Sequence, residues 1–186
     1  MIGFYPEAND DEIVHFLNET GLFEPVAADS IFQWDSISFF NHILWKNDPK
    51  ASMIYVKIKE PKTTYTQLKE IIRSLQMSPI VRVAEPTFCQ LNCWDVAAFA
   101  FYFFVKVKDR NDLSDLYAVM EETNTWIIAY LDDPRVYPVP YLDRFLLGAD
   151  KNSKGNARQM ANYFLETGKF VDTSPKLISK FVYMGQ

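Results

Sequence analysis

The sequence reads FLNETGLF at residues 16–23 and YFLETGKF at residues 163–170. In both phrases an apolar-periodic stretch that predicts a helix runs into Glu-Thr-Gly, skips one residue and resumes on a Phe. Gly21 and Gly168 stand where each predicted helix ends, because glycine takes the left-handed conformation after a helix without steric cost. The repeat therefore predicts the same passage from helix to strand at two distant places in the chain.

A second pair of phrases also indicates internal repetition. YVKIK occupies residues 55–59 and FVKVK residues 104–108, and a predicted helix follows each. This pair is offset by 49 positions, whereas the first pair is offset by 147. A single tandem duplication gives a single offset. Two alternatives therefore remain open: the domains have a circularly shifted ancestry, or one of the matches is due to chance.

Four helices are predicted from apolar residues spaced at i, i+3, i+4 and i+7, with charged residues on the opposite face. They cover residues 10–20, 64–76, 112–123 and 154–167. The N-caps expected for them are, in order, Asn9, Thr64, Asn111, and Asn152 or Ser153. The first two of these residues begin capping boxes, because Glu12 and Gln67 follow them three positions later.

Strand candidates bracket each helix, and several of them alternate apolar with polar side chains, as IYVKIK does. They cover Ile2–Tyr5, Val26–Trp34, Met53–Lys59, Ile80–Phe88, Ala98–Lys108, Thr125–Leu131, Tyr141–Gly148 and Phe170–Tyr183. The element order is then βαββαβ, twice. The sequence therefore predicts an α+β fold of two tandem ferredoxin-like domains, each an antiparallel sheet with its helices on one face. The domains are expected at residues 1–92 and 96–186.

The composition limits the class of protein. Hydrophobic residues make up 48% of the 186 residues, with 15 Phe, 10 Tyr and 4 Trp, which excludes disorder as a global description. A net charge of −5 with scattered lysines and arginines argues against nucleic-acid binding, which needs a basic surface. The sequence shows no apolar run of 18 residues and no secretory signal, so it predicts no membrane span and leaves the cellular location unknown.

The sequence contains no catalytic motif. There is no Gly-x-Ser-x-Gly, and His15 and His42 are the only histidines that could serve as a base, so no catalytic triad is predicted. The polar stretch DKNSKGN at residues 150–156 lacks the glycines and the Lys-Ser ending of a phosphate loop, and is interpreted as a loop and helix cap. Cys89 and Cys93 are expected to be free thiols. We therefore expect a protein that is not an enzyme, with no metal and no cofactor.

Aromatic residues provide one candidate site. Most Phe and Tyr residues lie in predicted strands, where core packing accounts for them. The segment SFFNHILW is difficult to place in a helix or strand, so Phe39, Phe40 and Trp45 are the best candidates for exposed aromatic side chains. This patch is the basis of the alternative hypothesis, a peptide- or glycan-binding module.

Three phrases resemble a known family. FVKVKDRNDLSDLY at 104–117 and NSKGNARQMANYFLETGKF at 152–170 are similar to the non-catalytic region that precedes the protease domain in subtilisin-like serine proteases of Bacteroidetes-type bacteria. The second phrase resembles that family's pattern SKGNA-x-x-MAN-x-F-x-E-(S/T)-G-x-F. VRVAEPTF at 81–88 is similar to the last strand of subtilisin propeptides.

The resemblance implies a propeptide-like interaction protein without an attached protease. Subtilisin propeptides are ferredoxin-like domains whose sheet face packs on the enzyme and whose C-terminal tail lies in the active-site cleft. The corresponding contact residues here are Phe181, Val182, Tyr183 and Met184. The expected partner is a subtilisin-like protease, which the chain would inhibit or chaperone. The resemblance also implies an exported or periplasmic location, and proteolysis by this chain itself is not expected.

Overall fold

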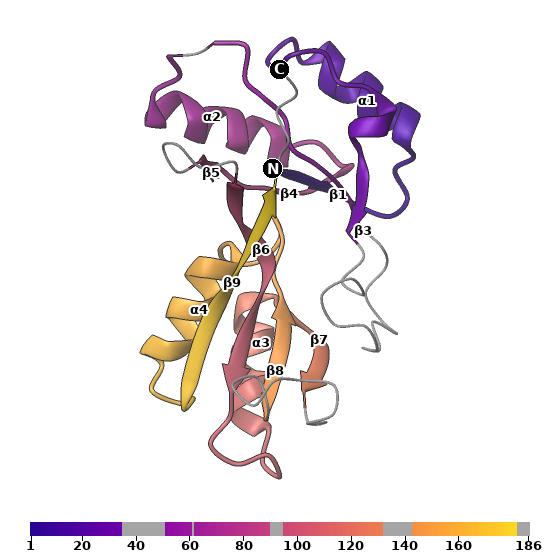
Figure 1. Ribbon diagram of the computed structural model, residues 1–186. Helices are drawn as coiled ribbons and strands as arrows, with labels where there is room; N and C mark the ends of the chain where they lie inside the picture. Colours follow the sequence, from indigo (N-terminus) through magenta and orange to yellow (C-terminus); the bar gives the residue numbers. More distant parts are fainter. Residues whose placement is uncertain (35–50, 61, 90–94, 132–142, 182–186) are drawn as a thin grey trace. The chain divides into compact units, whose positions relative to one another are not determined.

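The computed structural model describes residues 1–34, 51–60, 62–89, 95–131 and 143–181 (Figure 1). These residues form a mixed α+β fold with four α-helices and two antiparallel sheets, so the predicted α+β class is confirmed. They fall into two compact units, with the boundary between Phe88 and Cys89. We call the part before this boundary unit 1 and the part after it unit 2. The predicted linker Asn92–Val96 lies largely outside the described residues, so the predicted domain bounds stay a prediction.

Unit 1 contains a four-stranded antiparallel sheet and two helices. Its elements are β1 (Ile2–Phe4), α1 (Asp10–Glu19), the 3-10 turn Ala28–Ser30, β2 (Phe32–Trp34), β3 (Ala51–Ile54), α2 (Tyr65–Gln76) and β4 (Val81–Ala84). The strand order in space is β2-β3-β1-β4. Strand β1 is central, because Ile2 has Ile54 on one side and Ala84 on the other.

The core of unit 1 lies between its sheet and both helices. Phe4 from β1 and Ile13 and Leu17 from α1 are fully buried, and Leu75 from α2 packs into the same cluster. The other face of β1 is packed as well: a Cβ added at Gly3 would lie 2.8 Å from Val83 Cγ1. The apolar spacing that predicts the helices therefore corresponds to one buried face on each.

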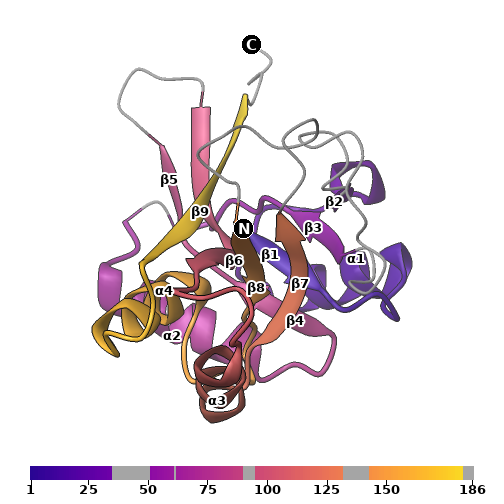
Figure 2. The same ribbon diagram turned by 90° about the horizontal axis from the view of Figure 1, so that it is seen from below.

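After an additional short strand, β5, unit 2 repeats this element order around a longer central strand. Its elements are β5 (Thr87–Cys89, at the boundary), β6 (Asp95–Lys106), α3 (Ser114–Thr123), β7 (Trp126–Leu131), β8 (Arg144–Gly148), α4 (Ala157–Glu166) and β9 (Asp172–Phe181). The strand order is β5-β6-β8-β7, and β9 pairs with β6. Figures 1 and 2 both show β9 lying along β6.

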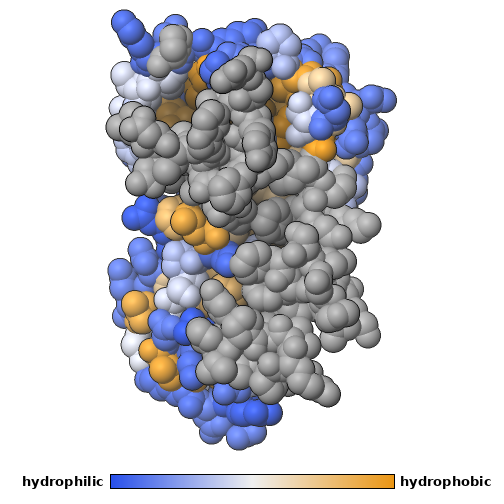
Figure 3. Space-filling model, in the orientation of Figure 1, coloured by the Kyte–Doolittle hydropathy of each residue, from blue (hydrophilic) through white to orange (hydrophobic). Residues whose placement is uncertain are grey.

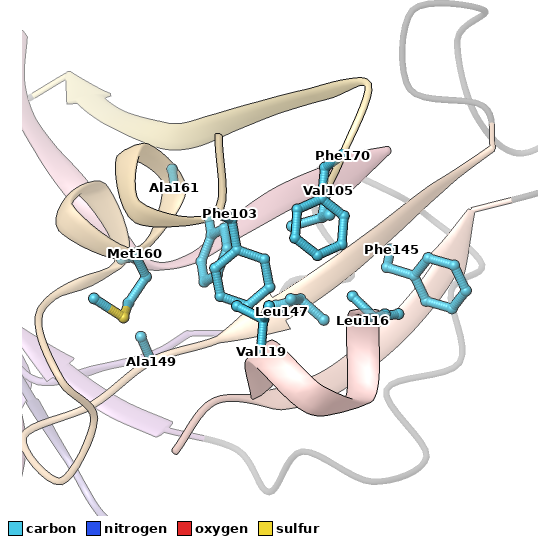
Figure 4. Packing of buried hydrophobic residues seen from close by; sticks show 12 residues of the cluster. Phe103, Val105, Leu116, Val119, Phe145, Leu147, Ala149, Met160, Ala161 and Phe170 are labelled. Atoms are coloured by element: carbon cyan, nitrogen blue, oxygen red, sulfur yellow. The ribbon is translucent and has the colours of Figure 1, made fainter. Parts of the chain in front are cut away.

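The core of unit 2 lies between this sheet and the two helices α3 and α4. Figure 4 shows Phe103 and Val105 of β6 among side chains from β8, α3 and α4. The ring of Phe164 lies 5.2 Å from that of Phe103 at a steep interplanar angle of 72°. It also stacks on Phe170 at 5.1 Å, which is favourable geometry for both aromatic pairs. Both helices of unit 2 therefore pack on one face of the sheet.

The helix ends confirm part of the prediction. The expected capping boxes at Asn9 and Thr64 are both formed. Gly21 and Gly168 have φ of +66° and +68°, as expected of glycines that follow helix ends. The first residues of α3 and α4 differ from the prediction.

Two predicted N-caps are wrong because other partners compete for them. The N-cap of α3 is Leu113 and not Asn111, since Asn111 donates its backbone N–H to Asp109 Oδ1 at 2.8 Å in a preceding turn. The N-cap of α4 is Asn156 and not Asn152 or Ser153. Short polar side chains bind nearby backbone as readily in turns as at helix ends, so the local sequence left several equivalent positions.

Candidate functional site

The two sites predicted from the sequence lie almost wholly outside the described residues. Phe39, Phe40 and Trp45 fall in the segment 35–50, and Val182, Tyr183 and Met184 follow the last described residue. Phe181 is the last residue of β9, where its backbone is the cross-strand partner of Asp95. Both sites therefore remain predictions, and the described residues show the elements from which they leave.

Strand β9 occupies one edge of the sheet in unit 2. It pairs with β6 from Asp172, opposite Lys106, to Phe181, opposite Asp95. Among the described strands, β9 pairs with β6 alone. Pro175 lies within β9 where the register shifts, and proline, which has no N–H to donate, is tolerated in an edge strand.

The start of β9 is fixed to the sheet by a partly buried ion pair. The guanidinium of Arg144, on β8, lies 2.7 Å from Asp172 Oδ2, and its Nη1 donates to Ser174 Oγ at 3.3 Å. The Arg144 side chain is only 17% exposed, so this contact is less screened by water than a surface pair. The arginine therefore holds β9 across the intervening strand β6.

Apolar side chains are exposed beside this edge. Val171 and Leu177 are about half exposed, at 55% and 50%. The guanidinium carbon of Arg158, on α4, lies 5.3 Å from the centroid of the Phe99 ring, and Phe99 is the cross-strand partner of Leu177. Partial burial lowers the pKa of Lys176, the residue before Leu177. The exposed Val171 and Leu177 thus lie next to an edge strand that pairs, among the described strands, with β6 alone.

The loop before α4 lies in the phrase NSKGNARQMANYFLETGKF at 152–170, and it makes several polar contacts. Ser153 Oγ donates to the carbonyl of Asn124 at 2.7 Å, and the N–H of Lys154 donates to the carbonyl of Thr123 at 2.9 Å. Asn156 then caps α4 in a capping box with Gln159. The residues S-K-G-N therefore join the end of α3 to the start of α4, which agrees with the interpretation of DKNSKGN as a loop and cap.

A surface cluster of Glu122, Lys154 and Tyr163 completes this junction. Lys154 Nζ lies 2.8 Å from Glu122 Oε1 and 3.0 Å from the Tyr163 hydroxyl, which also donates to Glu122. The hydrogen bond from Lys154, and then that from Tyr163, lowers the pKa of the Glu122 carboxyl. The hydrogen bond to Glu122 raises the pKa of Lys154. Both groups are therefore charged at neutral pH, and an ionised, exposed pair is not arranged for proton transfer.

Other potential chemistry is accounted for by local contacts. His15 lies on the exposed side of α1, with Nε2 3.2 Å from Glu19 Oε1. No group of three metal-binding side chains occurs within the described residues. None of the helices in those parts of the chain has the length and apolar character to span a bilayer. On the surface of unit 2 that Figure 3 shows, apolar residues form small spots among hydrophilic ones.

Comparison with known proteins gives no match: no family model, no curated protein and no solved structure is similar to this chain. The resemblance to protease propeptides therefore rests on the sequence phrases alone.

Proposed function

We propose that the protein is a non-enzymatic interaction protein that binds a subtilisin-like protease through β9 and the residues that follow it. The observation that supports this proposal is the position of β9, an edge strand that runs directly into residues 182–186. An extended segment can bind another protein by adding backbone hydrogen bonds as a strand does. The proposed contacts are Phe181, Val182, Tyr183 and Met184.

The proposed architecture of this protein is a pair of ferredoxin-like domains. Unit 1 and, from β6 onwards, unit 2 support it with a chain order of βαββαβ and an antiparallel sheet in which the last strand of that order lies beside the first, β4 beside β1 and β9 beside β6. The propeptide-like phrase VRVAEPTF supplies β4, which is an edge strand of unit 1. The position of this phrase at a strand supports the proposed likeness to a propeptide ending.

The partner is proposed to contact the edge of unit 2 and not its sheet face. Tyr102, Phe104 and Leu146 alternate along their strands with residues that pack against the helices, so they lie on the opposite face. All three are buried within this chain. The edge of β9, in contrast, pairs with no other strand among the described residues, and this supports the edge as the proposed contact.

The experiment is an inhibition assay with a subtilisin-like protease from the same organism and a chromogenic peptide substrate. The full chain is expected to inhibit in a dose-dependent manner, and truncation after Phe181 to weaken inhibition at least about tenfold, by loss of backbone and apolar contacts. Met77→Ser is the matched control, because Met77 is 81% exposed on unit 1. If the truncated chain inhibits as well as the full chain, the tail does not bind in the cleft.

A second candidate function is peptide or glycan binding by Phe39, Phe40 and Trp45. The observation that favours it is that β2, the strand before this segment, is one of the two edge strands of the described sheet in unit 1. Titration with peptide and oligosaccharide libraries is expected to change the tryptophan fluorescence, and Trp45→Ala to remove that change. A signal that survives Trp45→Ala would place the ligand elsewhere.

A further inference from the structure

Helices α1 and α4 match residue by residue at the offset of the first repeat. Both are ten residues long. The first and last residues of α4 each lie 147 positions after the first and last residues of α1. Asn9 and Asn156 are their N-caps, and each accepts at 3.0 Å from the residue three positions later, Glu12 or Gln159. Each of those residues binds back to its N-cap. Of the described helices, α2 also has a capping box, but α3 does not.

The match continues through the ends of both helices. Thr20 and Thr167 are the C-caps, and each hydroxyl donates at 2.7 Å to the carbonyl three residues earlier, of Leu17 or Phe164. A left-handed glycine follows each threonine. Both ends are therefore closed by the same set of bonds.

Burial depends on distant parts of the chain, and it also matches in part. Both buried residues of α1 have buried counterparts in α4, and the Phe that follows each Glu-Thr-Gly is buried as well. Helix α4 also buries Ala157 and Ala161, whose counterparts Asp10 and Val14 are exposed and partly buried. The equivalent buried pairs are Ile13 and Met160, Leu17 and Phe164, and Phe23 and Phe170.

In each unit an equivalent backbone hydrogen bond joins the residue after the Glu-Thr-Gly phrase to the phrase of the second repeat. In unit 1 the N–H of Glu24 donates to the carbonyl of Lys57 at 2.9 Å. In unit 2 the N–H of Val171 donates to the carbonyl of Lys106, also at 2.9 Å. Val171 follows Glu24 by 147 positions and Lys106 follows Lys57 by 49. The two different offsets thus describe one structural contact, which argues against a chance match.

We infer that unit 2 contains the same two halves as unit 1, joined in the opposite order. The half β1-α1-β2 corresponds to β8-α4-β9, and the half β3-α2-β4 corresponds to β6-α3-β7. Under this correspondence the strand order β2-β3-β1-β4 of unit 1 becomes β9-β6-β8-β7, which unit 2 contains together with the additional strand β5. A tandem order gives the same neighbours, so the strand order is compatible with the exchange and does not by itself select it.

The chain connections fit either order of the halves. In unit 1 the chain joins β2 to β3 and leaves the paired strands β1 and β4 without a direct connection. In unit 2 it joins β7 to β8 and leaves the paired strands β6 and β9 without one. Exchanged halves make these opposite junctions and a tandem order makes them the same junction. The inference therefore rests on the matched helices and on the hydrogen bond that joins the two repeats.

The correspondence bears on the two candidate binding segments. It makes β2 and β9 counterparts, so the segment with Phe39, Phe40 and Trp45 and the segment after Phe181 leave the two sheets at equivalent strand ends. This corollary rests on the proposed function, whereas the exchange of halves does not.

The test replaces residues 9–23 of the full chain with the fifteen residues 156–170, from α4. The control places residues 113–127, from α3, at the same position. A simple tandem order makes α3 the counterpart of α1, and α3 is also ten residues long. Exchanged halves make α4 the counterpart. We expect the α4 chimera to unfold cooperatively at a temperature at least about 5 °C above that of the α3 chimera.

The reciprocal exchange, residues 9–23 placed at 156–170, gives a second comparison in the other unit. Its control places residues 64–78 there, because α2 is the counterpart of α4 in a tandem order. The exchange of halves is wrong if neither in-register chimera is more stable than its control. An unfolded α4 chimera beside a folded α3 chimera would indicate the tandem order.

Discussion

The buried hydroxyl of Thr173, on β9, donates to the carbonyl of Ala161, in α4, at 2.5 Å. This bond joins the edge strand of unit 2 to the helix that covers it, and both residues are buried. It is one of the contacts that hold the strand leading into the proposed binding segment, together with those of Arg144.

Thr173→Val keeps the shape of the side chain and removes the donor. We expect it to lower the free energy of unfolding by about 1 kcal/mol, because a buried hydrogen bond is lost without a cavity. Urea unfolding followed by circular dichroism measures this loss. Thr173→Ser retains the hydroxyl and the hydrogen bond. It should therefore not lose the part of the free energy of unfolding that the bond contributes. Equal stability of the Val variant and the parent would show that the bond contributes nothing.

Gly168 supports a prediction about backbone conformation alone. A Cβ at this position meets no atom within 4 Å, so Gly168→Ala adds no clash. Its φ of +68° still disfavours alanine by about 1 kcal/mol. Gly168→Asn should be less destabilising, since asparagine adopts this conformation more readily. Chemical denaturation of the two variants tests the order, and the same order is expected at Gly21. An alanine variant as stable as the asparagine variant would contradict it.

Gly148 presents the opposite case, in which space and not backbone conformation is limiting. A Cβ there would overlap the indole ring of Trp126 and lie 2.7 Å from its Nε1. We expect Gly148→Ala to destabilise the protein by about 2 kcal/mol through overpacking, with a changed near-ultraviolet tryptophan signal. The double variant with Trp126→Leu should restore part of the stability. If the double variant loses as much free energy of unfolding as the two single variants lose together, or more, the clash is not the cause.

The α-amine of Met1 predicts a dependence of stability on pH. Burial lowers its pKa to about 5, against 8.0 for an exposed amine, although the charge of Glu85 opposes the shift. The amine donates to the carbonyl of Glu85 at 2.9 Å. Between these two pKa values the unfolded chain binds a proton that the folded chain does not, so stability increases with pH. Its contribution is fully present above about pH 8 and is lost as the pH falls towards 5, by at most about 4 kcal/mol.

Urea unfolding between pH 5 and 8, on protein that carries the free α-amine at Met1, measures this slope. Acetylation of the amine is the control, because it removes the titrating group while keeping a donor. A slope that is unchanged in the acetylated protein must come from other groups.

Local signals predicted the helices well and the strands less well. Asn9 with Glu12 and Thr64 with Gln67 identify two helix starts, because both partners lie within four residues. Strand bounds depend on partners far away: the predicted strand Val26–Trp34 is a 3-10 turn followed by three residues of β2. The predicted strand Ile80–Phe88 divides into β4 and β5 around Pro86.

The candidate site could be predicted only in part. The tail after Phe181 follows from the resemblance, but the edge position of β9 depends on the pairing of Asp95 with Phe181, which are 86 positions apart. The ion pair of Arg144 with Asp172 has no signal in the sequence, because either residue alone is typical of an exposed strand end. The relation between the two repeat offsets likewise requires the hydrogen bonds that join them.

The pairing of β6 with β9 also has a consequence for folding kinetics. In unit 1 the strands most distant in sequence, β1 and β4, share three cross-strand pairs, whereas β6 and β9 share nine. Unit 2 therefore places its longest ladder between β6 and β9, which are far apart in sequence, and such non-local pairing slows folding because loop closure precedes the gain from contacts. During synthesis β6 must wait several seconds for β9, at about 5–20 residues per second. Its apolar side chains, among them Phe103 and Phe104, stay without their final partners for that time. Unit 1 can close its sheet first, so we expect unit 2 to be the part of the chain that is longer exposed to aggregation during synthesis.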